Sequence, residues 1–65
     1  DEAIRINPDD AIAYHNRGLA KSKLGHLEGA ISDYNEALRI DPNNAKARAN
    51  REDAQRELRE REKET

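Results

Sequence analysis

The apolar residues in the central part of the chain recur in steps of three and four, the spacing of one face of an α-helix. Between positions 27 and 38 they are Leu27, Ala30, Ile31, Tyr34, Ala37 and Leu38. A second set, between positions 11 and 24, comprises Ala13, Tyr14, Leu19, Ala20 and Leu24. We therefore predict two helices, near 9–24 and 28–41, whose apolar faces pack against each other.

Glycine and proline mark the ends of these two segments. Gly25 suits the left-handed residue that ends a helix, so the chain can reverse there into an antiparallel hairpin. Pro8 and Pro42 disfavour helix in the residue before them, and the Asp or Asn residues that follow can cap the next helix. Gly18 leaves room for a large neighbour to approach the backbone, and we expect Ala30 opposite it at the crossing of the two helices.

The last third of the chain has a different pattern, because its apolar side chains are few. Alanine, arginine, glutamate and glutamine still favour a helix, near 44–62, and Glu52–Arg56 and Glu57–Arg61 are oppositely charged pairs four residues apart. Only Ala47, Ala54 and Leu58 form a stripe that can pack inward. We interpret the charged run as a solvated face in preference to a recognition surface, because the two signs alternate.

Composition excludes several classes of protein. The 65 residues are 34% hydrophobic and 40% charged, so the core of this single small domain is thin. Without cysteine there is no disulfide or thiolate metal site. The net charge of −2 argues against nucleic acid as a partner, and no long apolar run or signal peptide is present, so we expect no membrane contact and a cytoplasmic location.

The chain repeats itself with a period of 34 residues. When residues 2–24 are laid over residues 36–58, 11 of the 23 pairs are identical, among them Pro8 with Pro42 and Asn16 with Asn50. The first residues therefore match the end of a helix whose beginning is absent, and since the chain also lacks an initial Met we expect an excised or designed segment.

A 34-residue helix-turn-helix period with glycine, alanine and proline at fixed offsets resembles the tetratricopeptide repeat. The residues that carry the resemblance are Tyr14, Gly18, Ala30, Tyr34, Ala37 and Pro42. Arg17 and Lys21 depart from it, since they stand where the family has apolar residues, and we expect their stems to cover apolar surface while their charges reach water. The expected fold is all-α: a remnant of a preceding helix at 1–6, a helical hairpin at 9–42 and a C-terminal capping helix with a fraying tail at 44–65.

The resemblance also implies a function, because the first helices of this family line a concave groove that binds peptides or partner helices. Asn16 and Asn50 match an asparagine that commonly bonds the backbone of a peptide there. Lys46 resembles the lysine of a clamp for a peptide C-terminus, but Asn50 stands where that clamp needs arginine, so an intact clamp is not expected. The implied groove residues are Ile12, His15, Asn16, Leu19, Lys23, Lys46, Asn50 and Asp53.

Enzymatic chemistry has no support in the sequence. His15 and His26 have no cysteine or second histidine at ligand spacing, so we expect solvent-facing residues, no metal, no cofactor and no catalytic residue.

Two functions remain. The first is a non-enzymatic protein-interaction module, and the second is a self-assembling scaffold, natural or designed, whose main partner is itself. The second rests on the open N-terminal face, where one repeat with a cap falls short of the usual three, so we expect a symmetric homodimer. The residues expected in that contact are Ile4, Ile6, Ala13, Ala20 and Leu24.

Overall fold

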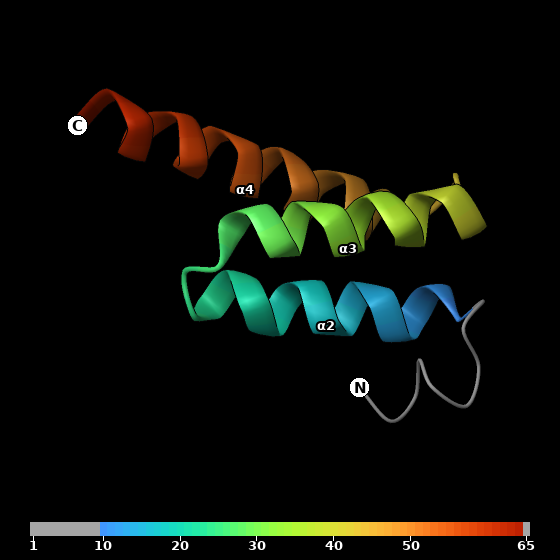
Figure 1. The fold of residues 1–65 in the computed structure, drawn as a ribbon. Helices are drawn as coiled ribbons and strands as arrows, with labels where there is room; N and C mark the ends of the chain where they lie inside the picture. Colours follow the sequence, from blue (N-terminus) through green and yellow to red (C-terminus); the bar gives the residue numbers. More distant parts are fainter. Residues whose placement is uncertain (1–9, 65) are drawn as a thin grey trace.

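A computed structural model describes residues 10–64, and within them the chain forms three α-helices (Figure 1). They are α2, Ala11–Lys23; α3, Leu27–Ile40; and α4, Ala45–Glu64. Helices α2 and α3 form an antiparallel hairpin, and α4 packs mainly against α3 while touching α2 at a few positions. The all-α prediction is confirmed, as are three helices within a few residues of the expected bounds. The expected remnant at 1–6 lies outside the described residues.

The residues predicted to cap and end the helices do so. The carboxylate of Asp10 accepts hydrogen bonds from the backbone N–H groups of Ile12 and Ala13, at 2.9 and 3.2 Å, and so caps α2. Asn44 caps α4 in the same way through the N–H of Ala47, at 3.0 Å. Between α2 and α3, Gly25 adopts a φ of 84°, which a residue with a side chain rarely does. The chain therefore reverses where the sequence indicated.

The core is built mostly from small side chains around one tyrosine. Helix α3 contributes four buried apolar residues, α4 two, and α2 one besides its glycine; they are Leu27, Ala30, Tyr34, Ala37, Ala47, Ala54 and Ala13. Leu19, Ile31 and Leu58 pack against this cluster while staying partly exposed. The alanines let three helices approach closely, and Tyr34 is the largest side chain that is fully buried among them.

Gly18 makes room for the ring of Tyr34 across the hairpin. A Cβ atom placed on Gly18 would lie 2.7 Å from Cε1 of the Tyr34 ring, closer than two such atoms can pack. Ala30, which was expected opposite Gly18, is fully buried on the same helix, α3. The large neighbour that the glycine admits is therefore aromatic.

Helix α4 packs through the stripe that its sequence predicts. Ala47 and Ala54 are buried, and Leu58 packs against the core cluster. On the outside, Glu57 pairs with Arg61 at 3.2 Å as expected. Arg56 differs, because it pairs with Asp53 at 2.6 Å rather than with Glu52.

Candidate functional site

The predicted groove residues lie on α2 and α4, and one hydrogen bond joins the two helices there. Nδ2 of Asn50 lies 2.8 Å from Nε2 of His15. The His15 ring also tilts against the ring of Tyr34, with 6.0 Å between their centroids. His15 is therefore half-buried and not the solvent-facing residue that we expected, since its neighbours on α3 and α4 cover it.

The remaining groove residues differ in how accessible they are. Asn16, Lys23 and Lys46 are exposed, and 68% of Ile12 is accessible to solvent. These four carry an amide, two ammonium groups and an apolar side chain, and the accessible Ile12 is unusual because large apolar residues are seldom left this open. A binding partner would meet all of them without any rearrangement of the chain.

Two other predicted groove residues are already engaged within the chain. Leu19 packs against the core cluster, so only part of its side chain is open. The exposed carboxylate of Asp53 accepts a hydrogen bond from Arg56, one turn further along α4. Neither contact excludes a ligand, but each reduces what the residue can offer.

A buried carboxylate that the sequence reading missed ties α2 to α3. Asp33 is only 3% exposed and accepts two hydrogen bonds from Arg17, from Nε at 2.9 Å and Nη2 at 2.7 Å. Nζ of Lys21 lies 3.1 Å from the same carboxylate. The stem of Lys21 packs against Gly29, and both cations pair with Asp33 while their side chains stay 32% and 34% exposed, so the expectation missed the pairing with Asp33. The signal was the pair of basic residues one turn apart at apolar positions of the repeat.

The electrostatics of this buried cluster follow from burial and pairing. Burial alone would raise the pKa of the Asp33 carboxyl, but the hydrogen bonds from Arg17 and Lys21 outweigh it and the pKa lies below its usual value. The hydrogen bond to Asp33 in turn raises the pKa of Arg17. Burial also raises the pKa of Tyr34. Asp33 is therefore charged at neutral pH and its role is to hold the hairpin together.

The residues predicted for self-association do not all lie on the surface. Leu24, directly after α2, is 72% exposed, and Ala20 on α2 is exposed too. Ala13 is only 6% exposed, so it belongs to the core of this chain and offers almost nothing to a second copy. Ile4 and Ile6 lie outside the described residues.

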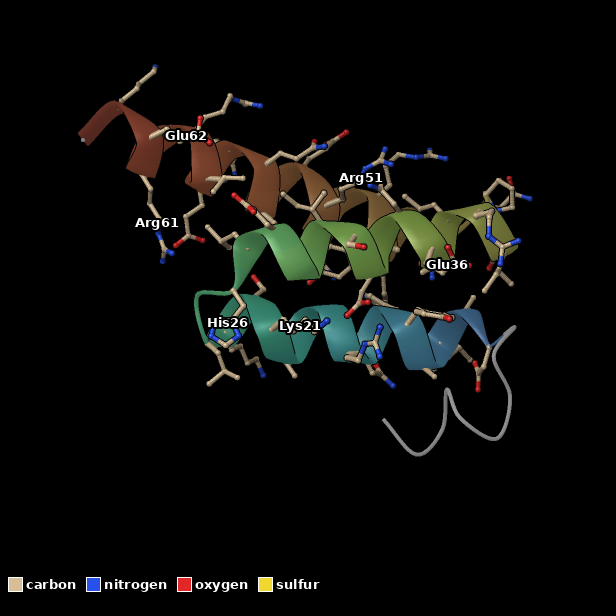
Figure 2. The ribbon with its side chains drawn as sticks, viewed as in Figure 1. Lys21, His26, Glu36, Arg51, Arg61 and Glu62 are labelled. Atoms are coloured by element: carbon tan, nitrogen blue, oxygen red, sulfur yellow. The ribbon has the colours of Figure 1, made fainter. Side chains whose placement is uncertain are left out.

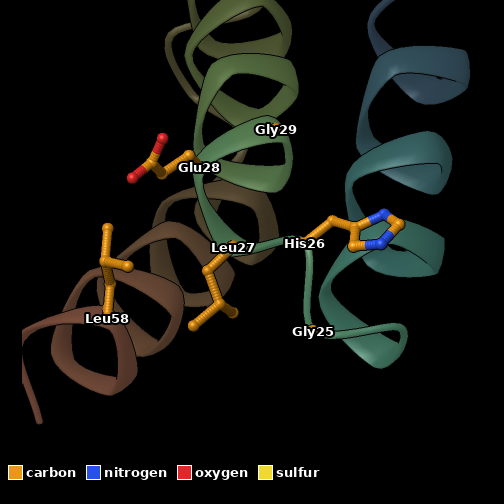
Figure 3. A pocket seen from close by; sticks show the side chains of 6 residues that line it. All are labelled: Gly25, His26, Leu27, Glu28, Gly29 and Leu58. Atoms are coloured by element: carbon orange, nitrogen blue, oxygen red, sulfur yellow. The ribbon is translucent and has the colours of Figure 1, made fainter. Parts of the chain in front are cut away.

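One shallow pocket lies away from the groove residues, at the turn between α2 and α3 (Figure 3). Its volume is about 320 Å³. Leu58 of α4 forms one wall, and the turn and the first residues of α3 form the rest; they are Gly25, His26, Leu27, Glu28 and Gly29. Nη1 of Arg61 donates a hydrogen bond to the carbonyl oxygen of Gly25 in this turn, at 3.1 Å. With a single carboxylate and a single imidazole, the pocket has no evident set of catalytic groups.

Two kinds of feature are absent from residues 10–64. No group of three or more histidine, cysteine, aspartate or glutamate side chains is placed to hold a metal ion. Among the helices of this same range, none combines the length and apolar character needed to cross a membrane.

Comparison with known protein families identifies the family to which this helical hairpin belongs. The model of the tetratricopeptide repeat matches residues 11–44, which cover α2, α3 and the turn into α4. The chain belongs to the tetratricopeptide repeat family. In this family, a helical hairpin such as that of α2 and α3 is one repeat. Tetratricopeptide repeats are protein–protein interaction modules, and this chain shares their construction.

Several known proteins are similar to this chain over a short stretch. RNA polymerase II-associated protein 3 of Xenopus laevis is 46% identical over 46 residues, covering 71% of this chain and 7% of that protein. Mitochondrial import receptor subunit TOM70 of Homo sapiens is 40% identical over 47 residues, covering 72% of this chain and 8% of that protein. Hsp70-Hsp90 organizing protein 3 of Arabidopsis thaliana is 42% identical over 41 residues, covering 63% of this chain and 7% of that protein. The chain thus spans less than a tenth of each of these relatives.

Proposed function

We propose that the surface shared by α2 and α4, defined by the groove residues above, binds an extended peptide or a partner helix. The observation that carries this proposal is the hydrogen bond between His15 and Asn50. It joins the two helices along the proposed groove and fixes the Asn50 amide, which keeps further hydrogen-bonding capacity for a ligand.

The chemistry of the surface suits a peptide better than a small molecule. Asn16 offers an exposed amide, which can both donate to and accept from a peptide backbone. Ile12 offers apolar area to a ligand side chain, and Lys46 offers a cation to a ligand carboxylate. Relatives named as a chaperone-organizing protein and as an import receptor agree with a role in recognising other proteins.

A selection experiment tests the groove. Peptides of about twelve residues, displayed on phage, are selected against the full chain, and the dissociation constant of each hit is measured by fluorescence anisotropy. Because hydrogen bonds of this kind contribute about 0.5–1.5 kcal/mol, Asn16→Ala and Asn50→Ala should each weaken binding roughly twofold to tenfold.

Asn43→Ala is the matched control, since Asn43 is an exposed asparagine in the turn before α4. It should leave the dissociation constant unchanged. Hits that bind equally well to both groove variants would refute the groove as the binding surface.

Self-association is the second candidate, and exposed Leu24 is the observation that favours it. An apolar side chain this open on a helix face gains from burial against another molecule, worth about 1.5–3 kcal/mol for a leucine. Sedimentation velocity over a range of concentrations distinguishes monomer from dimer. Leu24→Glu should shift a dimer to monomer, and a wild-type chain that stays monomeric at high micromolar concentration would refute this candidate.

A further inference from the structure

Arg17 and Arg51 are equivalent residues, 34 positions apart, in the first helix of two successive units. The guanidinium edge of Arg17 formed by Nε and Nη2 receives both carboxylate oxygens of Asp33. In Arg51 only Nη1 has a hydrogen-bond partner among residues 10–64, namely Oδ1 of Asn35 at 2.8 Å, and Nε is buried without one. The edge that binds a carboxylate in one unit is therefore unpaired in the next.

This unpaired edge lies where α4 meets α3, on the side of α3 away from α2 and Lys21 (Figure 2). Arg51 stands five positions after Lys46, which places it about 140° around α4 from that groove residue. It is half-buried, and its one hydrogen bond, to Asn35, is exposed. To meet a partner, the edge must turn outward through a change of side-chain torsions that breaks this bond.

We propose that this part of α4, the Arg51 face, docks a helix of another protein that presents a carboxylate to Arg51. The face is defined by Arg51, Glu52 and Gln55, which are equivalent to Arg17, Gly18 and Lys21. A planar guanidinium and a carboxylate form two parallel hydrogen bonds, as Arg17 and Asp33 do, and this pairing is stronger than one between neutral groups. The partner helix takes the place that α3 has on α2.

Glu52 determines a second feature of the partner. The equivalent glycine, Gly18, admits the ring of Tyr34, the residue that follows Asp33. Glu52 fills that space with an exposed carboxylate that has no ion-pair partner in the described part of the chain. A lysine or arginine directly after the partner's carboxylate residue neutralises it, whereas an aromatic residue is excluded.

The face contains no apolar stripe, because Arg48, Arg51, Glu52 and Gln55 are all polar. Recognition therefore rests on charge and hydrogen bonding, and it weakens as salt is added.

The probe is a synthetic helix copied from the chain itself. It has the sequence of residues 25–41 with two substitutions, Tyr34→Lys and Ser32→Lys. A lactam bridge between Glu28 and the lysine at position 32 holds the peptide helical, and both positions are exposed on α3. Its binding to the full chain is followed by fluorescence anisotropy. A second peptide carries Asp33→Asn in addition.

We expect the first peptide, which keeps Asp33 and is called the Asp33 peptide, to bind the wild-type chain. Replacing it with the Asp33→Asn peptide, or replacing the wild-type chain with the Arg51→Gln variant, should raise the dissociation constant about tenfold or more. Arg51→Lys keeps the charge without the planar edge and should weaken binding as well. Arg56→Gln is the matched control, because it removes one positive charge about 140° away on the same helix and should change the dissociation constant less than about twofold. Circular dichroism confirms that each variant keeps its helices.

A charge swap separates a direct pair from general attraction. Arg51→Glu should abolish binding of the Asp33 peptide and gain binding of a peptide with Asp33→Lys. The proposal is overturned if the Asp33 peptide does not bind at about 1 mM, or if Arg51→Gln and Arg56→Gln change its affinity equally.

Discussion

Replacing Asp33 by asparagine removes the charge that Arg17 and Lys21 share while keeping the shape of the side chain. Hydrogen bonds to charged groups contribute about 1.5–3 kcal/mol, and Asp33 receives them from two cations. Loss of one partner of a fully buried pair costs about 3–5 kcal/mol. Here the side chains of Arg17 and Lys21 are 32% and 34% exposed, so water can solvate them after the change. We therefore expect a smaller loss, about 2 kcal/mol.

Thermal unfolding followed by circular dichroism at 222 nm measures this loss. For a domain of this size, 1 kcal/mol shifts the melting temperature by roughly 4–8 °C, so Asp33→Asn should melt about 8–16 °C below the wild type at pH 7. Asp53→Asn is the matched control, because its pair with Arg56 is exposed on both sides and should matter little.

Acid provides the second half of the test. The folded-state pKa of Asp33 is lowered, so its contribution is complete above the usual carboxyl pKa of about 4 and is lost as the pH falls through the folded-state value. The two melting curves should therefore converge in acid. Equal melting temperatures at pH 7, or a gap that stays constant into strong acid, would refute the stabilising role of this carboxylate.

Three further predictions concern the hairpin and α4. Gly18→Ala should lower the free energy of unfolding by about 1 kcal/mol or more, because the new methyl group meets the buried Tyr34 ring. The methyl group of Gly29→Ala meets only a flexible lysine stem, so this variant should be neutral or stabilising. Urea titration measures both free energies, and equal effects would contradict the packing described for Gly18. Deleting residues 45–65, the proposed cap, should expose the apolar face of α3 and cause unfolding or aggregation, and a folded, monomeric 1–44 fragment seen by circular dichroism and sedimentation would count against it. Because burial raises the pKa of Tyr34, the stability that this residue contributes is fully present below the ordinary tyrosine pKa of about 10 and should be lost as the pH rises through the folded-state value. Thermal melts of Tyr34→Phe at a series of pH values should lack this alkaline loss. If the loss persists in the variant, Tyr34 is not its cause.

The fold followed from the sequence because its local signals agreed with one another. The apolar spacing in α3, the left-handed Gly25 and the caps Asp10 and Asn44 each act within a few residues, and all predicted the same hairpin. The stripe on α4 was also predictable, since Ala47 and Ala54 repeat the pattern of α2.

The contacts between helices were less predictable, because they depend on which side chains meet across the interface. Asp33 looked like a surface residue by type, and only its position against Arg17 and Lys21 shows why it is buried. The contact of the Tyr34 ring with Gly18 was missed for the same reason, since the sequence pattern singled out only Ala30 at this crossing. The bond between His15 and Asn50 joins residues 35 positions apart, and no local pattern predicts it.

The measurement that tests the proposed groove most directly is a nuclear magnetic resonance titration of the isotope-labelled full chain with a selected peptide. We predict that the side-chain amide signals of Asn16 and Asn50 and the ring signals of His15 shift together, with one dissociation constant. The signals of Gly25 and Gly29, which line the pocket at the turn, should stay in place. Shifts confined to that turn, or spread evenly over all three helices, would contradict a groove formed by α2 and α4.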